Sequence, residues 1–124
     1  MFKLKRAYAE AQKSDGVRVL VERLWPRGLS KDKAALDSWM KELAPSPGLR
    51  QWFGHDPKKF ALFRERYRQE LAENDELVDE LRRLGTRATV TLVYGSRDEQ
   101  HNAAVVLKDV LEEKASGTRS RSGA

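Results

Sequence analysis

Three short runs of the sequence combine aromatic, charged and hydrogen-bonding residues in a way that favours a binding or catalytic site over a plain core. They are residues 19–28, 52–57 and 93–102. Each run ends an apolar segment with polar groups, which is how a scaffold presents chemistry at the rim of a sheet or helix. We therefore expect the three runs to form the walls of one site.

Anion binding is the chemistry that the first and third runs favour. Gly95 and Ser96 follow a predicted strand and precede a predicted helix, where backbone amides and the helix dipole attract negative charge. Arg27 and Arg97 add positive charge. In the alternative interpretation the loop binds nothing, and Asp98 only caps the helix.

Proton transfer is the second chemistry that these residues allow. A histidine beside a carboxylate can act as a general acid or base near neutral pH, and His101 is close in sequence to Asp98. In the alternative interpretation, His55 caps a turn and His101 lies in a first helical turn. The sequence contains no H-E-x-x-H spacing, so we expect no metal site, and nothing in it identifies a cofactor.

The predicted site contains two groups of residues. The candidates for proton transfer are His101, Glu22 and Asp98. The candidates for ligand binding are Arg23, Trp25, Arg27, Gly28, Trp52, His55, Tyr94, Gly95, Ser96, Arg97 and Asn102. The two tryptophans are predicted walls for a planar ligand, although tryptophan more often packs in a core or at its rim.

Three segments have the pattern of β-strands. Residues 2–8 alternate as an edge strand, residues 17–24 are rich in β-branched side chains, and residues 89–94 form a buried strand. Residues 37–44 fit both helical spacing and strand alternation, so the pattern leaves their structure open.

Capping residues predict where the helices begin and end. The predicted N-caps are Ser30, Ser46 and Asp56. Apolar side chains recur at helical spacing over residues 60–71, 77–84 and 103–111. Asn74 or Asp75 is the predicted start of the second of these helices, and Gly85 is its predicted C-terminal stop.

These elements predict an α/β fold, a small single-domain sandwich with a mainly parallel sheet flanked by helices. Residues 1–114 are the predicted domain, and the small, polar residues 115–124 are a predicted flexible C-terminal tail. Ligands of parallel α/β sheets favour the crevice beyond the carboxyl ends of the strands. The polar runs that follow the second and the last strand are expected to meet there.

The composition of the 124 residues excludes several function classes. The absence of cysteine excludes disulfides and thiolate chemistry, and no Walker, Rossmann or G-x-S-x-G pattern occurs. No stretch is apolar enough to span a membrane and no signal stretch follows the basic N-terminus, so the expected location is the cytoplasm. The net charge is +5, but only +3 without the tail, which is a weak basis for nucleic-acid binding.

Several motifs in order resemble a known family. They are Arg23-Leu24-Trp25-Pro26-Arg27-Gly28, Leu43-Ala44-Pro45-Ser46, Trp52-Phe53-Gly54-His55-Asp56-Pro57, Phe63-Arg64-Glu65-Arg66-Tyr67 and Arg97-Asp98-Glu99-Gln100-His101-Asn102. In this combination, from about Lys3 to Lys114, the chain resembles the YeaO-like branch of a bacterial domain-of-unknown-function family, number four-eight-eight. The resemblance implies a small cytoplasmic α/β protein without an established activity. It also implies an aspartate where this chain has Glu22, and longer relatives with a cysteine-containing loop whose chemistry the absence of cysteine excludes here.

Polar runs at the strand ends predict a pocket for a small anionic ligand that bears phosphate or carboxylate, and they leave open whether the protein is an enzyme. The alternative is a nucleic-acid-associated module, favoured by the basic excess, the Arg-Ser tail and the tryptophans. A third interpretation, a partner-binding domain, needs an exposed apolar patch that a sequence does not show. Neither the oligomeric state nor a reaction type follows from the sequence.

Overall fold

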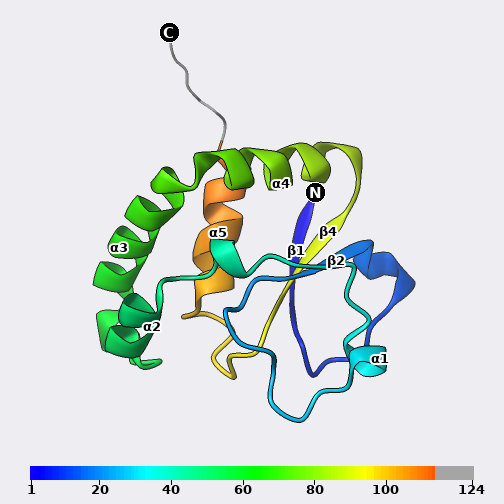
Figure 1. Ribbon diagram of the computed structural model, residues 1–124, viewed down its shortest axis with the longest axis horizontal. Helices are drawn as coiled ribbons and strands as arrows, with labels where there is room; N and C mark the ends of the chain where they lie inside the picture. The colour runs from blue at the N-terminus through cyan, green and yellow to red at the C-terminus, as the bar shows by residue number, and fades with distance from the viewer. Residues whose placement is uncertain (114–124) are drawn as a thin grey trace, which may run out of the picture.

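Four parallel β-strands organise residues 1–113, the part of the chain that the computed structural model describes (Figure 1). The strands are β1 (Phe2–Arg6), β2 (Val17–Leu20), β3 (Ser38–Trp39) and β4 (Val90–Tyr94). Their order in the sheet is β1-β4-β2-β3, so the last strand of the sequence lies between the first two. This architecture confirms the predicted α/β fold with a parallel sheet.

The central strand β4 is in register with both of its neighbours. Phe2 of β1 and Val17 of β2 each lie opposite Val90 of β4. All five residues of β4 are buried, as expected for a parallel strand that is covered on both faces. Because the three strands start level and run in the same direction, their carboxyl ends reach the same edge of the sheet.

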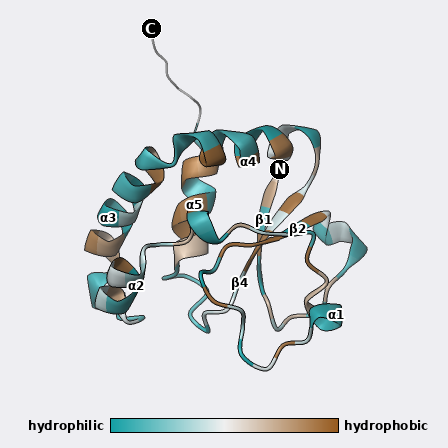
Figure 2. Ribbon diagram, in the orientation of Figure 1, coloured by the Kyte–Doolittle hydropathy of each residue, from teal (hydrophilic) through white to brown (hydrophobic). Residues whose placement is uncertain are grey.

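Three helices cover one face of the sheet. They are α3 (Phe60–Glu73), α4 (Asp75–Arg87) and α5 (Ala103–Glu112). Helix α5 lies against β1 and β4 and also contacts α3 and α4, so it is the central helix of this layer (Figure 1). Hydrophilic and hydrophobic residues alternate along α3 and α4 (Figure 2), as amphipathic helices over a core require.

The opposite face of the sheet is covered by an irregular connection. Residues 21–37 contain a single short helix, α1 (Lys31–Ala34). Trp25 and Trp39 pack here against a small buried cluster that includes Val93 of β4. The sheet is therefore flanked by long helices on one face and by a loop-rich layer on the other.

The three predicted N-caps are confirmed. The side chains of Ser30, Ser46 and Asp56 accept hydrogen bonds from amides two or three residues further along the chain. Ser46 begins α2 (Pro47–Phe53), and Asp56 begins a 3-10 turn (Pro57–Lys59) that leads into α3. The undecided segment 37–44 contains both the short strand β3 and a 3-10 turn (Lys41–Leu43).

The predicted C-terminal end of α4 is wrong, because Gly85 does not end this helix, which continues to Arg87. Glycine is needed there because the ring of Phe2 fills the space that a Cβ atom would occupy. The predicted start of this helix is confirmed, since α4 begins at Asp75 and Asn74 is its N-cap residue. The side chain of Asn74 forms no capping hydrogen bond to the helix, and its amide donates to the carbonyl oxygen of Glu42.

The first two strands end earlier than predicted, at Arg6 and Leu20. Arg6 pairs with Tyr94, the last residue of β4, and Leu20 pairs with Val93. The amide of Val21 still donates to the carbonyl oxygen of Val93.

The predicted tail, residues 115–124, lies outside the described residues. Among residues 1–113, no helix has the length and apolar character needed to cross a bilayer.

A buried ion cluster links Asp15, in the connection between β1 and β2, to the sheet. The carboxylate of Asp15 accepts hydrogen bonds from the Lys5 ammonium at 2.9 Å and from the Arg18 guanidinium at 2.7 Å. The carbonyl oxygen of Asp15 accepts a hydrogen bond from the hydroxyl of Thr91 on β4. Burial by itself would raise the pKa of Asp15, but the hydrogen bonds from both cations and from a backbone amide lower it to about 2.

We predict that Asp15→Asn lowers the free energy of unfolding by about 3 kcal/mol at neutral pH, because the buried Arg18 loses its counter-charge. A pKa lowered from 3.8 to about 2 means that the ionised carboxylate stabilises the fold by about 2.5 kcal/mol. This stabilisation is present above the ordinary pKa and is lost as the pH falls from about 4 to about 2. Urea unfolding of both proteins across the acid range measures the two effects.

Asp79→Asn is the matched control for that experiment. Asp79 also pairs with an arginine three residues away, Arg82, but its side chain is 52% exposed, against 5% for Asp15. The control is expected to lose less than about 1 kcal/mol. Equal losses in the two variants would contradict a stabilising role of the buried cluster.

Gly85→Ala is expected to lower the free energy of unfolding by about 2 kcal/mol, although alanine is the better helix former. The cause is the collision of the new methyl group with the ring of Phe2. Gly48→Ala is the control, because the space around Gly48 in α2 is open, and it is expected to be neutral or slightly stabilising. Thermal unfolding compares the two, and a Gly85→Ala variant as stable as the control would refute the packing argument.

Candidate functional site

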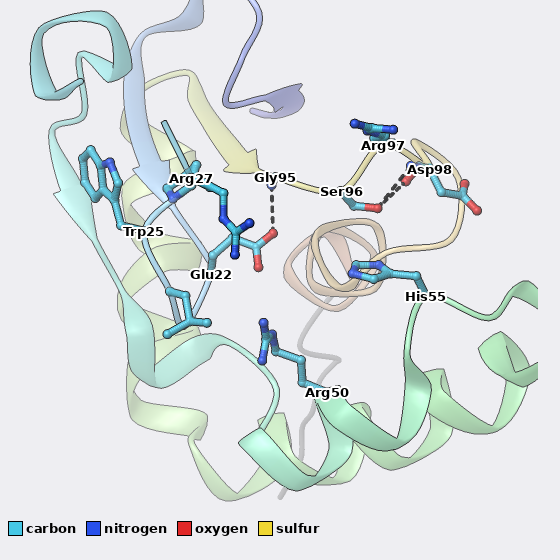
Figure 3. Close-up of a pocket in the computed structure, with 11 residues that line it drawn as sticks. Glu22, Trp25, Arg27, Arg50, His55, Gly95, Ser96, Arg97 and Asp98 are labelled. Atoms are coloured by element: carbon cyan, nitrogen blue, oxygen red, sulfur yellow. Dashed lines mark hydrogen bonds between the residues drawn. The ribbon is translucent and has the colours of Figure 1, made fainter. Parts of the chain in front are cut away.

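A cleft of about 620 Å³ lies where the chain leaves β2 and β4, next to the end of α2 (Figure 3). Its lining comes from three segments. The connection after β2 contributes Glu22, Leu24, Trp25, Pro26 and Arg27; helix α2 and the turn after it contribute Arg50 and His55; and the loop after β4 contributes Gly95, Ser96, Arg97 and Asp98. The three polar runs of the sequence therefore each supply part of one cleft.

One hydrogen bond joins the two strand ends across the cleft. The amide of Gly95 donates to the carboxylate of Glu22 at 2.8 Å (Figure 3). The amide that was expected to face a bound anion thus has an acceptor within the protein. Gly95 also lies well before α5, whose N-cap is Asn102, so neither Gly95 nor Asp98 begins the helix.

Three arginines give the cleft its positive charge. Arg27, Arg50 and Arg97 are all exposed, and within residues 1–113 none of their guanidinium groups forms an ion pair. In Figure 3 the guanidinium groups of Arg27 and Arg50 lie near the carboxylate of Glu22, and Arg97 lies on the far side of Gly95. Arg50 was absent from the predicted site. Its position one helical turn before the Gly54-His55 corner was the signal that could have identified it.

An unusual backbone conformation brings His55 to the cleft. Helix α2 ends at Gly54 with φ of 53°, and His55 follows with φ of 60°. Glycine adopts this left-handed region at little cost, whereas a side-chain-bearing residue there is uncommon and strained. These two residues turn the chain out of the helix, and the imidazole of His55 lines the cleft opposite Trp25 (Figure 3).

The loop after β4 is held by its own hydrogen bonds. The carboxylate of Asp98 accepts from the amides of Gln100 and His101 and lies 2.9 Å from Nδ1 of His101. The Gln100 amide, followed by the His101 side chain, lowers the pKa of Asp98, although partial desolvation opposes the shift. The hydroxyl of Ser96 exchanges hydrogen bonds with the backbone of Asp98, and among residues 1–113 it contacts no side-chain base that could activate it.

Six of the predicted site residues do not line the cleft. They are Arg23, Gly28, Trp52, Tyr94, His101 and Asn102. The guanidinium of Arg23 donates to the carbonyl oxygens of Ala44 and Pro45. Trp52 lies instead beneath the cations of Arg66 and Lys59, 4.6 Å and 5.1 Å from its ring centre.

Three more of the predicted residues outside the cleft have structural contacts. Tyr94 is buried in the core, and this burial raises its pKa. Asn102 caps α5 by accepting from the amide of Val105. The ring of His101 packs edge-on against Phe60, with 5.2 Å between ring centres. Of the three proton-transfer candidates, Glu22 and Asp98 therefore line the cleft, and His101 reaches it only through Asp98.

Within residues 1–113, no group of three or more histidine, aspartate or glutamate side chains is arranged to hold a cation. A smaller cavity of about 50 Å³ lies beside the cleft and is lined in part by Asn102 and Ala103 at the start of α5. It shares Glu22, Arg50, His55 and Ser96 with the main cleft, so the two spaces are neighbours.

Comparisons with known proteins give one family and several bacterial relatives. Residues 1–123 match the family DUF488-N3i, described as "Inactive DUF488-N3 subclade". The chain is 43% identical over 107 residues to the uncharacterized protein YeaO of Escherichia coli K12, a match that covers 86% of this chain and 93% of that protein. It is 40% identical over 109 residues to the uncharacterized proteins Mb3100c of Mycobacterium bovis and Rv3073c of Mycobacterium tuberculosis, covering 88% of this chain and 92% of each. No solved structure matches the chain.

His101→Ala is expected to raise the pKa of Asp98 toward its ordinary value without reaching it, because the hydrogen bond from the Gln100 amide remains. A pH titration of the Asp98 carboxyl carbon by NMR measures the shift. His55→Ala is the control, since His55 shares the cleft with Asp98 but forms no hydrogen bond to it among the described residues. An Asp98 pKa that stays unchanged in His101→Ala would show that the imidazole contributes nothing.

Proposed function

The chain belongs to the DUF488-N3i family, described as an inactive subclade of DUF488-N3, and we propose that this protein binds a small phosphate- or carboxylate-bearing molecule in the cleft without transforming it. Membership confirms the resemblance to the YeaO-like branch that the sequence motifs indicated. The observation that carries the proposal is the presence of Arg27, Arg50 and Arg97 on one cleft, without carboxylate partners among residues 1–113.

The charge balance of the cleft favours an anion. Two carboxylates line it together with the three arginines. The carboxylate of Asp98 is already engaged by two amides and by His101, and that of Glu22 by the Gly95 amide. Guanidinium groups bind phosphate and carboxylate through paired, charge-assisted hydrogen bonds. A ligand with two or more anionic oxygens would give these cations the partners that residues 1–113 do not provide.

Binding without chemistry agrees with the nucleophiles available. The chain has no cysteine, and the Ser96 hydroxyl is occupied by hydrogen bonds to the Asp98 backbone. A serine nucleophile needs an adjacent base, and the cleft presents none in contact with Ser96. The description of the family as inactive points in the same direction.

Replacement of each cleft arginine by glutamine is expected to weaken the binding of inorganic phosphate about tenfold, because each loses a charged hydrogen-bond donor. Amide NMR titrations of the full chain with phosphate measure the affinity and locate the site through shifts at residues 22–27 and 95–98. Arg83→Gln on the exposed side of α4 is the control and is expected to leave the affinity unchanged.

Glu22→Gln is the complementary variant and is expected to tighten phosphate binding severalfold, because it removes a negative charge from the cleft while its amide oxygen can still accept from Gly95. Absence of saturable shifts with phosphate in every variant would refute the proposal. A short oligonucleotide that instead produces diffuse, salt-sensitive shifts over lysine-bearing surfaces would favour the nucleic-acid-associated module.

A further inference from the structure

We infer that the ligand of the cleft is a mononucleotide, with its base against the wall formed by Leu24, Trp25 and Pro26 and its phosphate among the arginines. This inference rests on the anion binding proposed above and adds the chemical class of the rest of the ligand. Three features of the cleft carry it, namely its size, its apolar wall and the position of Glu22 between the wall and His55.

The size of the cleft exceeds what a simple anion needs. Its volume of about 620 Å³ lies within the roughly 300–1,000 Å³ range of small-molecule and cofactor sites. Inorganic phosphate alone would leave most of this space to water. A larger organic ligand that carries an anionic group would fill both the charged part of the cleft and its apolar part.

The remainder of the cleft is an apolar wall with a fixed aromatic ring. Leu24 is 58% exposed, although it is a large apolar residue. Trp25 beside it is held in place, since its indole nitrogen donates to the carbonyl oxygen of Leu29 at 2.7 Å. Its ring also packs edge-on against Trp39, with 5.5 Å between ring centres. A rigid, half-buried tryptophan next to an exposed leucine is a surface on which a planar ring can pack at little entropic cost.

The order of groups across the cleft matches the order of groups in a mononucleotide. In Figure 3, Trp25 and His55 lie on opposite sides of the Glu22 carboxylate. In the same view His55 and Arg97 lie on the side of Glu22 away from Trp25, and Arg50 lies below Glu22, so the phosphate would bind among these three groups. Only one oxygen of Glu22 accepts from Gly95, so the other can accept a hydrogen bond from a ribose hydroxyl. Base, sugar and phosphate would then each meet a group suited to it.

The test compares three probes on the full-length protein, namely adenosine monophosphate, ribose 5-phosphate and inorganic phosphate. Adenosine monophosphate is expected to bind about tenfold more tightly than ribose 5-phosphate, because the base gains an aromatic and apolar contact. The chain has three tryptophans, and their indole N–H resonances report the location of the base. The Trp25 resonance should shift with the nucleotide, whereas that of Trp52, outside the cleft, should not.

Two variants separate the base and the sugar contacts. Leu24→Ser is expected to weaken adenosine monophosphate about fivefold and to leave ribose 5-phosphate unchanged. Leu62→Ser is its matched control, because Leu62 is also exposed, at 43%, but lies on α3. Glu22→Gln should tighten inorganic phosphate more than adenosine monophosphate, since both phosphates gain from the lost charge but the nucleotide also loses the carboxylate acceptor for its ribose hydroxyl.

The outcomes distinguish this inference from the proposal beneath it. Equal affinities for adenosine monophosphate and ribose 5-phosphate, with a stationary Trp25 resonance, would overturn the mononucleotide inference and leave anion binding intact. Failure of all three probes to bind would overturn both. Tighter nucleotide binding that is equally sensitive to Leu24→Ser and Leu62→Ser would also refute the assigned wall.

Discussion

Parallel pairing of β4 with β1 on one side and with β2 on the other is the constraint on which the rest of the structure depends. It requires a strand from the end of the chain to lie between two strands from its beginning, and it requires both faces of β4 to be buried. Helix α5 and its neighbours cover one face, and the connection after β2 covers the other. The same pairing sends the chain out of β2 and β4 at one edge, which is where the cleft forms.

The hydrogen bond between Gly95 and Glu22 is the local interaction that shapes this edge. It spans 73 positions of the sequence and fixes the separation of the two loops that line the cleft. The Glu22 carboxylate also accepts the hydrogen bond of the Gly95 amide, which is then not free for a ligand anion. If the cleft binds an anion, as proposed, the attraction would come from side chains, chiefly the three arginines, rather than from a backbone cradle.

A buried ion cluster and one tight packing contact hold the strands of the sheet in position. The carboxylate of Asp15 bridges β1 and β2 through Lys5 and Arg18. The backbone carbonyl oxygen of Asp15 accepts a hydrogen bond from Thr91 of β4. At the N-terminal end, Phe2 packs on Gly85, so α4 is held close to the first strand. None of these residues lines the cleft, yet their contacts help to position the strands that deliver its residues.

The sequence by itself determined the features that depend on neighbouring residues. Side-chain caps at Ser46 and Asp56, the helical spacing of α3 and the β-branched run of β4 act over a few positions, so the fold class and most elements could be predicted. The polar runs likewise indicated all three segments of the cleft.

Only the tertiary structure decided which residues of those runs face one another. Trp25 and Trp52 have equivalent chemistry, but one forms a cleft wall and the other lies beneath surface cations of α3 and its leading turn. Gly85 has the sequence context of a helix stop, but its lack of a side chain leaves room for the ring of Phe2. Such outcomes depend on contacts between segments that are remote in the sequence, and local propensity carries no information about these contacts until the strands have paired.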